Sequence, residues 1–264
     1  MDNLTFFFLI IQAVAAPYTT SNFSSESPAA DNYVLVNNVV SKNTPHAEID
    51  STAFLYKAIG LAKYDLSLEV FTYALTGYHK LDQQGRLGNK KILSIIDFTK
   101  SSSKKRFYTI DLANFKLIFH TYVSHGKNTG EDKATSFSNV MHSNQSSLGF
   151  YVTAETYIGS KGYSLKLDGM ERGYNDLMRE RAVVIHNADY VSESWIRKYG
   201  RLGRSQGCPA LPQEIGKKII DTVKDGTVIF GYFDDHRYLA ASSYLANDNF
   251  VAKATRERLQ QASF

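Results

Sequence analysis

Two segments near the amino end of the chain carry hydrophobic residues at helical spacing. They cover residues 49–61 and 66–81, and Asp65 stands where it would cap the second one. A loop (QQGRLGN, 83–89) follows. The pattern therefore predicts a small helical cap over residues 49–89. The apolar stripe of the second helix consists of Leu66, Val70, Phe71, Ala74, Leu75 and Tyr78.

From residue 91 onward the pattern changes to short apolar or alternating runs separated by Gly, Asn and Ser, which is typical of β-strands. We expect hairpins at 111–114 and 159–162, and short helices at 191–199 and 213–223. The predicted fold class is mainly β with short helices, in a mostly antiparallel domain over residues 90–234. The candidate strands are 92–98, 106–111, 115–124, 148–158, 163–167, 182–185 and 227–233.

The two ends of the chain differ from this domain. Residues 1–16 join an apolar run to the small residues Ala15 and Ala16, as a secretory signal peptide does, although no Lys or Arg precedes the run. Residues 17–48 predict a polar linker, and residues 235–264 predict a polar helical tail. No later run reaches the roughly 20 apolar residues of a bilayer span. We therefore expect a secreted or periplasmic protein without a stable membrane span; a cytosolic thiol enzyme is the alternative.

Composition narrows the classes of function. The 30 Lys and Arg residues against 26 Asp and Glu residues give a net charge of +4, which is a weak argument for nucleic acid as a partner. Hydrophobic residues make up 43% of the chain, which excludes wholesale disorder. The single cysteine, Cys208, cannot form an internal disulfide and excludes a multi-cysteine zinc or iron–sulfur site.

The residues best suited to chemistry gather in one window, 182–211. An apolar run ends at His186, and the glycine-containing loop GRLGRSQGCPAL then delivers Cys208. Gly203 and Gly207 allow backbone conformations in which successive amides converge on an anion. A helix that started at Pro209 would lower the pKa of the neighbouring thiol. Thiolate, base and amides are the parts of cysteine-based acyl transfer, although the same residues are compatible with a buried structural thiol and a core histidine.

This window resembles the L,D-transpeptidase (YkuD-like) family, whose signature is a His near a strand end followed by S-x-G-C. The match is closer to the subgroup of murein L,D-transpeptidase catalytic domain proteins, and it covers residues 50–234. It implies the family's β-sandwich-like catalytic domain, preceded here by the helical cap. The stretches that carry the resemblance are RSQGCPALP (204–212), QSSLGFY (145–151), YSLKLDG (163–169) and IHNADYVS (185–192).

The resemblance also implies roles for individual residues. Cys208 is expected to be the nucleophile and His186 the general base, with the backbone carbonyl of Asn187 orienting the imidazole. No metal or organic cofactor is expected, because the thiol and backbone amides supply the chemistry.

The nucleophile loop is expected to supply the oxyanion hole, and it departs from the family at two positions. Amides of Gln206, Gly207 and Cys208 are expected to bind the oxyanion, with Ser205 shaping the loop. The family commonly has His or Lys where Gln206 stands, and Arg where this chain has Ala210.

Four further residues are candidates for holding substrate. Arg204 or Arg201 would replace the missing arginine in anion binding, and Tyr163 and Asp168 are candidates for the substrate groove.

The implied function is a cysteine-dependent murein L,D-transpeptidase acting on tetrapeptide stems of peptidoglycan. Stem peptides would be both donor and acceptor, and a Cys thioester would lead to a 3–3 cross-link. Three alternatives stay open: an L,D-carboxypeptidase in which water resolves the thioester, attachment of an outer-membrane protein to murein, and a non-catalytic wall-binding module.

Overall fold

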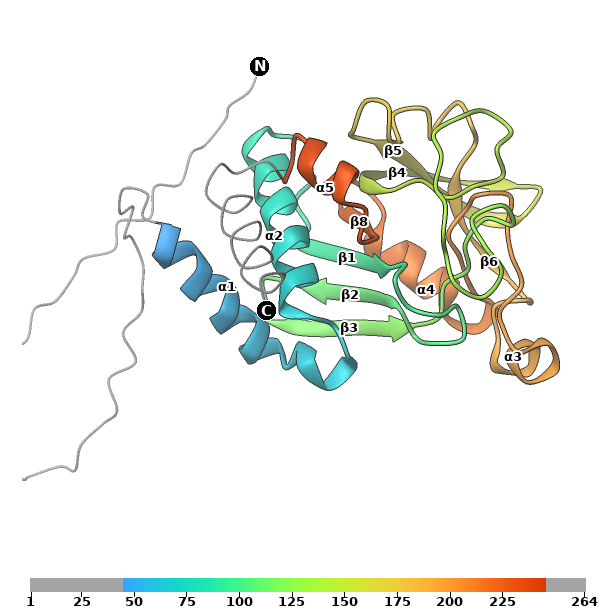
Figure 1. Ribbon diagram of the computed structural model, residues 1–264, viewed down its shortest axis with the longest axis horizontal. Helices are drawn as coiled ribbons and strands as arrows, with labels where there is room; N and C mark the ends of the chain where they lie inside the picture. Colours follow the sequence, from blue (N-terminus) through green and yellow to red (C-terminus); the bar gives the residue numbers. More distant parts are fainter. Residues whose placement is uncertain (1–44, 246–264) are drawn as a thin grey trace, which may run out of the picture. The chain divides into compact units, whose positions relative to one another are not determined.

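Eight strands form one continuous sheet in the computed structural model, which describes residues 45–245 (Figure 1). Helices α1 and α2 and the short 3-10 helix η1 precede the sheet, and three further helices lie among or after its strands. The elements are α1 (Pro45–Ile59), η1 (Leu61–Tyr64), α2 (Leu68–Gln83), β1 (Ile92–Asp97), β2 (Phe107–Asp111), β3 (Lys116–Thr121), β4 (Gly149–Gly159), β5 (Gly162–Gly169), β6 (Val184–Ala188), α3 (Glu193–Tyr199), β7 (Ala210–Pro212), α4 (Gln213–Val223), β8 (Val228–Tyr232) and α5 (His236–Ala241).

The strand order is β3-β2-β1-β8-β4-β5-β6-β7. The pairs β1–β8 and β6–β7 are parallel, and the other neighbouring pairs are antiparallel. These directions place the carboxyl ends of β1 and β8 at the same end of the sheet as the amino ends of β6 and β7. The mainly β, mostly antiparallel fold with a helical cap is thereby confirmed.

The two edges of the sheet approach each other just beyond β3. The Ser124 amide donates a hydrogen bond to the carbonyl of Ala210 in β7 (2.9 Å). Gly126 forms a parallel bridge with Ser205, whose amide donates to the carbonyl of His125 (3.0 Å). Backbone hydrogen bonds therefore fix the loop that precedes β7 to the segment that follows β3.

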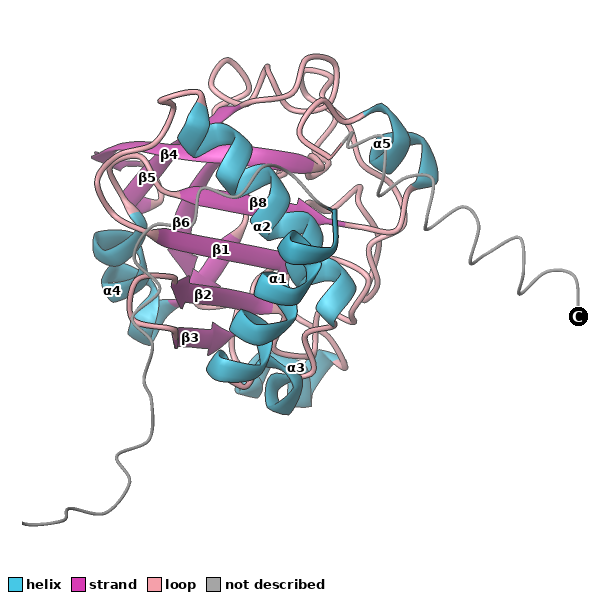
Figure 2. Cartoon of the chain, turned by 90° about the vertical axis from the view of Figure 1, so that its left-hand side faces the viewer, coloured by secondary structure: helices cyan, strands magenta, loops and turns pink. Residues whose placement is uncertain are grey.

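Helix α2 packs its apolar stripe onto the sheet, and Figure 2 shows α1 and α2 in front of β1, β2 and β8. Its N-cap is Ser67, whose Oγ accepts a hydrogen bond from the amide of Val70 (3.1 Å). The prediction of Asp65 as the cap is wrong, because Asp65 adopts a left-handed conformation (φ 59°) that ends η1. Gly77 allows the close approach, since a Cβ there would lie 2.0 Å from the ring of Phe150.

The remaining predicted elements lie close to their observed positions, with two exceptions. Residues 210–212 form β7, so the prediction of a helix from Pro209 is wrong. Ala210 is fully buried and pairs with His186 in β6, and α4 starts directly after Pro212. His186 consequently lies within β6 and not at its end. Helix α1 begins at Pro45, inside the predicted linker.

Several predictions concern segments outside the described residues. They are the signal peptide, the linker up to residue 44 and the tail beyond residue 245. Between residues 45 and 245, no helix has the length and hydrophobicity that crossing a membrane requires.

Candidate active site

Cys208 lies directly before β7 and faces the neighbouring strand β6. Its Sγ accepts a hydrogen bond from the amide of Val184 (N···S 3.4 Å) and lies 3.8 Å from the carbonyl oxygen of Ala182. Because β6 and β7 are parallel and Ala210 pairs with His186, the segment that carries the thiol enters the strand next to the one that carries the imidazole. The thiol lies beside Val184, two residues before His186 along β6.

The loop before Cys208 is held in shape by the hydroxyl of Ser205. This hydroxyl donates to the carbonyl of Cys208 (2.6 Å) and accepts from the amide of Gly207 (3.1 Å). Gly207 has φ +119°, a region that favours glycine, and a Cβ there would lie 2.8 Å from the carbonyl oxygen of Gln145. The Ser and Gly of the S-x-G-C motif therefore have structural reasons to be at these positions.

The amides of this loop differ in their availability to a substrate oxyanion. The Gly207 amide is engaged with Ser205. The amides of Gln206 and Cys208 donate no hydrogen bond to any group within residues 45–245. Of the predicted oxyanion-hole donors, these two amides are the ones free to bind substrate.

His186 is buried in β6, and its ring has a defined tautomer. Its Nδ1 lies 2.9 Å from the backbone carbonyl oxygen of Asn187, which can only accept a hydrogen bond. The proton of the neutral ring is therefore on Nδ1, and Nε2 carries the lone pair. Burial lowers the pKa of His186, and the positive charge of Lys161 adds to this effect. The ring is therefore neutral near pH 7, as a general base must be.

The Cys208 thiol has a pKa above its ordinary value, because burial disfavours the thiolate. The Val184 amide and the charges of Arg181 and Lys161 act in the opposite direction. The sequence predicted a lowered pKa from a helix start at Pro209, and this prediction is wrong because a strand follows instead. The resting thiol is thus protonated and needs a base.

Arg181 is a residue of this site that the sequence analysis missed. It lies three residues before β6, and its guanidinium donates to the carbonyls of Ser138 (2.7 Å) and Gln145 (2.6 Å). It also donates to the hydroxyls of Ser147 (2.6 Å) and Ser143 (3.1 Å). These bonds fix the segment 138–147 next to the nucleophile loop. No local sequence signal marks this role, because the four partners of Arg181 lie 34 to 43 residues earlier in the chain.

The two arginines predicted to bind an anion are engaged with protein groups. Arg204 donates to Glu131 (2.7 Å) and to the carbonyl of Lys127 (2.9 Å). Arg201 forms an ion pair with the same carboxylate of Glu131 (3.0 Å). Their role in substrate binding stays a prediction.

The two predicted groove residues also have protein partners. The hydroxyl of Tyr163 donates to Asp221 (2.6 Å). Asp168 accepts from Arg179 (2.9 Å) at the protein surface. Their contact with substrate likewise stays a prediction.

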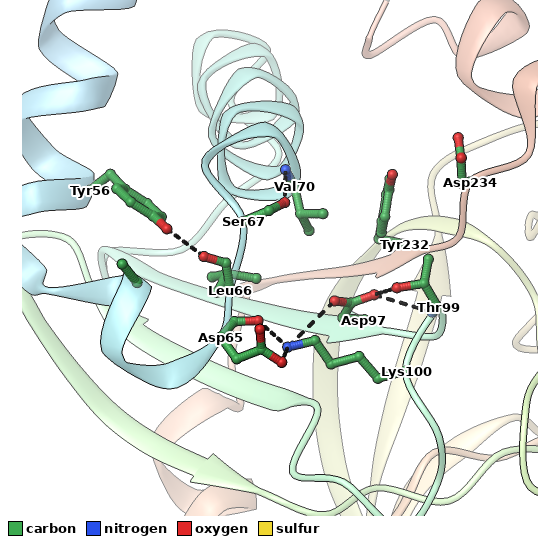
Figure 3. Close-up of a pocket in the computed structure, with 11 residues that line it drawn as sticks. Tyr56, Asp65, Leu66, Ser67, Val70, Asp97, Thr99, Lys100, Tyr232 and Asp234 are labelled. Atoms are coloured by element: carbon green, nitrogen blue, oxygen red, sulfur yellow. Dashed lines mark hydrogen bonds and ion pairs between the residues drawn. The ribbon is translucent and has the colours of Figure 1, made fainter.

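A pocket of about 560 Å³ lies away from these residues, between the helical cap and the carboxyl ends of β1 and β8 (Figure 3). Lys100 is one of its lining residues, with its Nζ 2.8 Å from Asp65 and 3.9 Å from Asp97. The same Nζ donates to the hydroxyl of Tyr108 (2.9 Å), and Asp97 accepts from the amide of Thr99 (3.1 Å). Lys100, Asp65 and Asp97 are thus partnered with one another, and the third carboxylate of the lining, Asp234, lies 3.9 Å from His236.

Comparisons with known proteins give one family. A family model described as the L,D-transpeptidase catalytic domain matches residues 62–232, more than half of the chain. No curated protein matches the sequence.

Solved structures similar to this one include L,D-transpeptidases of two bacteria. One, from Mycobacterium smegmatis, matches with a TM-score of 0.35 and 12% identity, over 55% of this chain and 59% of that chain. The other, from Stackebrandtia nassauensis, matches with a TM-score of 0.33 and 16% identity, over 72% of this chain and 79% of that chain. The match thus spans less than two thirds of the mycobacterial chain.

Proposed function

Because the chain belongs to the L,D-transpeptidase catalytic domain family, we propose that it is a cysteine-dependent murein L,D-transpeptidase. Its substrates would be tetrapeptide stems of peptidoglycan, and its product a 3–3 cross-link. The observation that carries the proposal is the pairing of β6 with β7, which brings a single thiol next to the strand of a neutral histidine with a basic Nε2.

The first half-reaction forms a thioester on Cys208. Nε2 of His186 accepts the thiol proton, and the sulfur attacks the carbonyl carbon of the L-centred third residue of the stem. The amides of Gln206 and Cys208 bind the oxyanion that forms. Collapse of this intermediate breaks the C–N bond, and the imidazolium returns its proton to the amine of the departing D-Ala.

The second half-reaction transfers the acyl group to an amine of another stem. The amine attacks the thioester carbonyl and passes a proton to Nε2 of His186. The C–S bond then breaks, the new amide forms the cross-link, and the proton returns to the sulfur of Cys208. If water attacked in place of the amine, the same intermediate would give the L,D-carboxypeptidase reaction. If the amine belonged to an outer-membrane protein, the product would be that protein attached to murein.

The proposal includes export from the cytoplasm, because its substrate lies outside that compartment. Residues 1–16 are the proposed signal peptide. Cell fractionation, with a mass measurement for cleavage after Ala15 or Ala16, tests this part.

The test is incubation of the full chain with a disaccharide-tetrapeptide, followed by intact-mass spectrometry of protein and products. We expect an acyl adduct on Cys208, loss of D-Ala and a cross-linked dimer. Tripeptide without dimer would replace the transpeptidase by the carboxypeptidase. A chain that forms neither adduct nor product but binds whole sacculi would overturn the proposal in favour of a wall-binding module.

A further inference from the structure

The guanidinium of Arg181 differs from those of Arg179, Arg201 and Arg204 in having only neutral partners among the described residues. All four of its hydrogen bonds end on carbonyl or hydroxyl oxygens. Within residues 45–245 it forms no ion pair, whereas Arg179, two residues earlier, binds both Asp168 and Glu155. Arg201 and Arg204 likewise share a carboxylate. Arg181 therefore carries a half-buried positive charge that no carboxylate balances.

Burying such a charge has a cost that a nearby anion would reduce. Partial burial removes water from the guanidinium, and neutral oxygens compensate for only part of the lost hydration. The charge is permanent, because arginine does not deprotonate in proteins. The fold thus maintains a fixed cation that has no fixed anion.

The nearest anion that the site can generate is the thiolate of Cys208. One terminal nitrogen of Arg181 lies 3.6 Å from the point that a Cβ on Gly207 would occupy. The same nitrogen binds the carbonyl of Gln145, which also lies against Gly207. The guanidinium therefore lies on the side of Gly207 where a side chain would be, beside the residue that immediately precedes the nucleophile.

The other titratable groups around the thiol are less suited to balance it. Lys161 is exposed in the turn between β4 and β5, where solvent and salt weaken its field. Tyr190 remains a neutral phenol near pH 7, since burial raises its pKa to about 12. His186 becomes a cation only when it has taken the thiol proton.

We propose that Arg181 supplies the permanent positive charge that stabilises the Cys208 thiolate, an inference that rests on the proposed cysteine chemistry. When the proton moves from Sγ of Cys208 to Nε2 of His186, the guanidinium stabilises the negative sulfur. It donates no proton and forms no covalent bond. Its hydrogen bonds to the segment 138–147 hold that charge against Gly207, so Arg181 acts on the reaction through the thiol.

The test measures alkylation of Cys208 by iodoacetamide as a function of pH, read by intact mass on the full chain. Cys208 is the single cysteine, so the adduct reports on one thiol. For Arg181→Gln we expect the apparent pKa of the thiol to rise by about one unit and the rate at pH 7 to fall about tenfold. Arg181→Lys keeps the charge and should stay within about threefold of the wild-type rate. Arg172→Gln removes an exposed charge from the same connection and should change nothing.

A second pair of variants leaves Arg181 in place. Ser143→Asp offers its guanidinium a carboxylate, whereas Ser143→Asn has nearly the same shape without the charge. We expect the Asp variant to raise the apparent thiol pKa and the Asn variant to leave it unchanged. A thermal melt shows whether Arg181→Gln folds. If it does not fold, this second pair of variants still tests whether the charge of Arg181 lowers the thiol pKa.

The inference is overturned if folded Arg181→Gln, or Ser143→Asp, keeps the wild-type thiol pKa. Arg181 would then only clamp the loop. Because alkylation needs no peptidoglycan, this result is independent of the outcome with the stem peptide. The Arg181 variants could thus shift the thiol pKa as expected even if the chain does not cross-link stem peptides. Equally, the chain could cross-link stem peptides while the Arg181 variants leave the thiol pKa unchanged.

Discussion

Two clusters of charged residues lie at the same end of the sheet, and they are organised in opposite ways. In the pocket below the helical cap, Lys100 is bound by Asp65 on one side and approached by Asp97 on the other. In the site next to β6, Arg181 has no carboxylate partner within the described chain, and two amides of the nucleophile loop are free. In the pocket the cation is bound by carboxylates, whereas the cation of the thiol site has only neutral partners among the described residues.

This difference in charge pairing favours the thiol site over the pocket as the place of the proposed reaction. A lysine already held by two carboxylates and a tyrosine hydroxyl has little left to offer a ligand, so the Lys100 cluster in this pocket serves the fold. Free amides, a basic nitrogen and an unbalanced cation next to a thiol can instead stabilise charge that develops during a reaction. Unsatisfied bonding capacity, and not the size of a cavity, is therefore what distinguishes the proposed active site.

The largest effect should come from Cys208→Ala. Removing the sulfur removes the only thiol and with it the thioester, so turnover of the tetrapeptide should fall at least about 10³-fold. The thermal melting temperature should stay close to wild type, because the substitution deletes one atom and leaves the hydrogen bonds of Ser205 to the loop backbone in place. Product release measured by mass spectrometry checks this prediction. Retained turnover would mean that the reaction does not use the Cys208 thiol.

The next largest effect should come from His186→Gln, measured as acylation rate against pH. Burial lowers the pKa of His186, so the wild-type rate should rise to its plateau on a limb below pH 6.5. Without the base, acylation waits for spontaneous ionisation of a thiol whose pKa burial raises above 9.0. The variant should therefore be about 10²- to 10⁴-fold slower at pH 7 and should still gain rate up to pH 9. An unchanged pH profile would contradict the assignment of Nε2 as the base.

These two residues and most of the fold can be predicted from the sequence because they leave local signals. Alternating or continuous apolar runs mark the strands other than β7, and S-Q-G-C marks the loop of Cys208. Strand β7 leaves no such signal. It is three residues long, and only its pairing with β6 and with Ser124 makes it a strand.

The features that the sequence does not predict depend on contacts between distant segments. The thiol pKa was predicted in the wrong direction because a helix was expected where β7 lies. Arg181 matters because its partners at positions 138–147 are neutral and because Gly207 lies beside it. No local pattern reports that a charge lacks a partner in the folded chain.

A change in the pocket should affect stability and not catalysis, which is the sharpest contrast between the two regions. Lys100→Met leaves the carboxylate of Asp97, whose side chain is 5% exposed, without its nearest cation. We expect a loss of about 2 to 4 kcal/mol in the free energy of unfolding, with turnover of folded protein unchanged. The double variant Lys100→Met/Asp97→Asn should recover part of this loss in urea unfolding.

The pH dependence of that loss has a definite sign. Burial raises the pKa of Asp97 in the folded state, and removal of Lys100 raises it further. The folded variant then binds more protons than the unfolded chain between the two pKa values, so its stability falls as pH rises through that range. The deficit of Lys100→Met should be larger at pH 7 than at pH 4. A deficit that is equal at both pH values would mean that the carboxylate of Asp97 is not the source of the loss.

The smallest effect should come from Asp65→Asn, which removes the other carboxylate that binds Lys100. The Asp65 side chain is 95% exposed, so water replaces most of what the ion pair contributes. We expect the free energy of unfolding to change by less than about 1 kcal/mol, and this small change to shrink further in 0.5 M salt. Urea unfolding at two salt concentrations measures it, with Lys100→Met as the reference. If Asp65→Asn cost as much as Lys100→Met, the pocket would depend on its exposed ion pair and not on the buried carboxylate of Asp97.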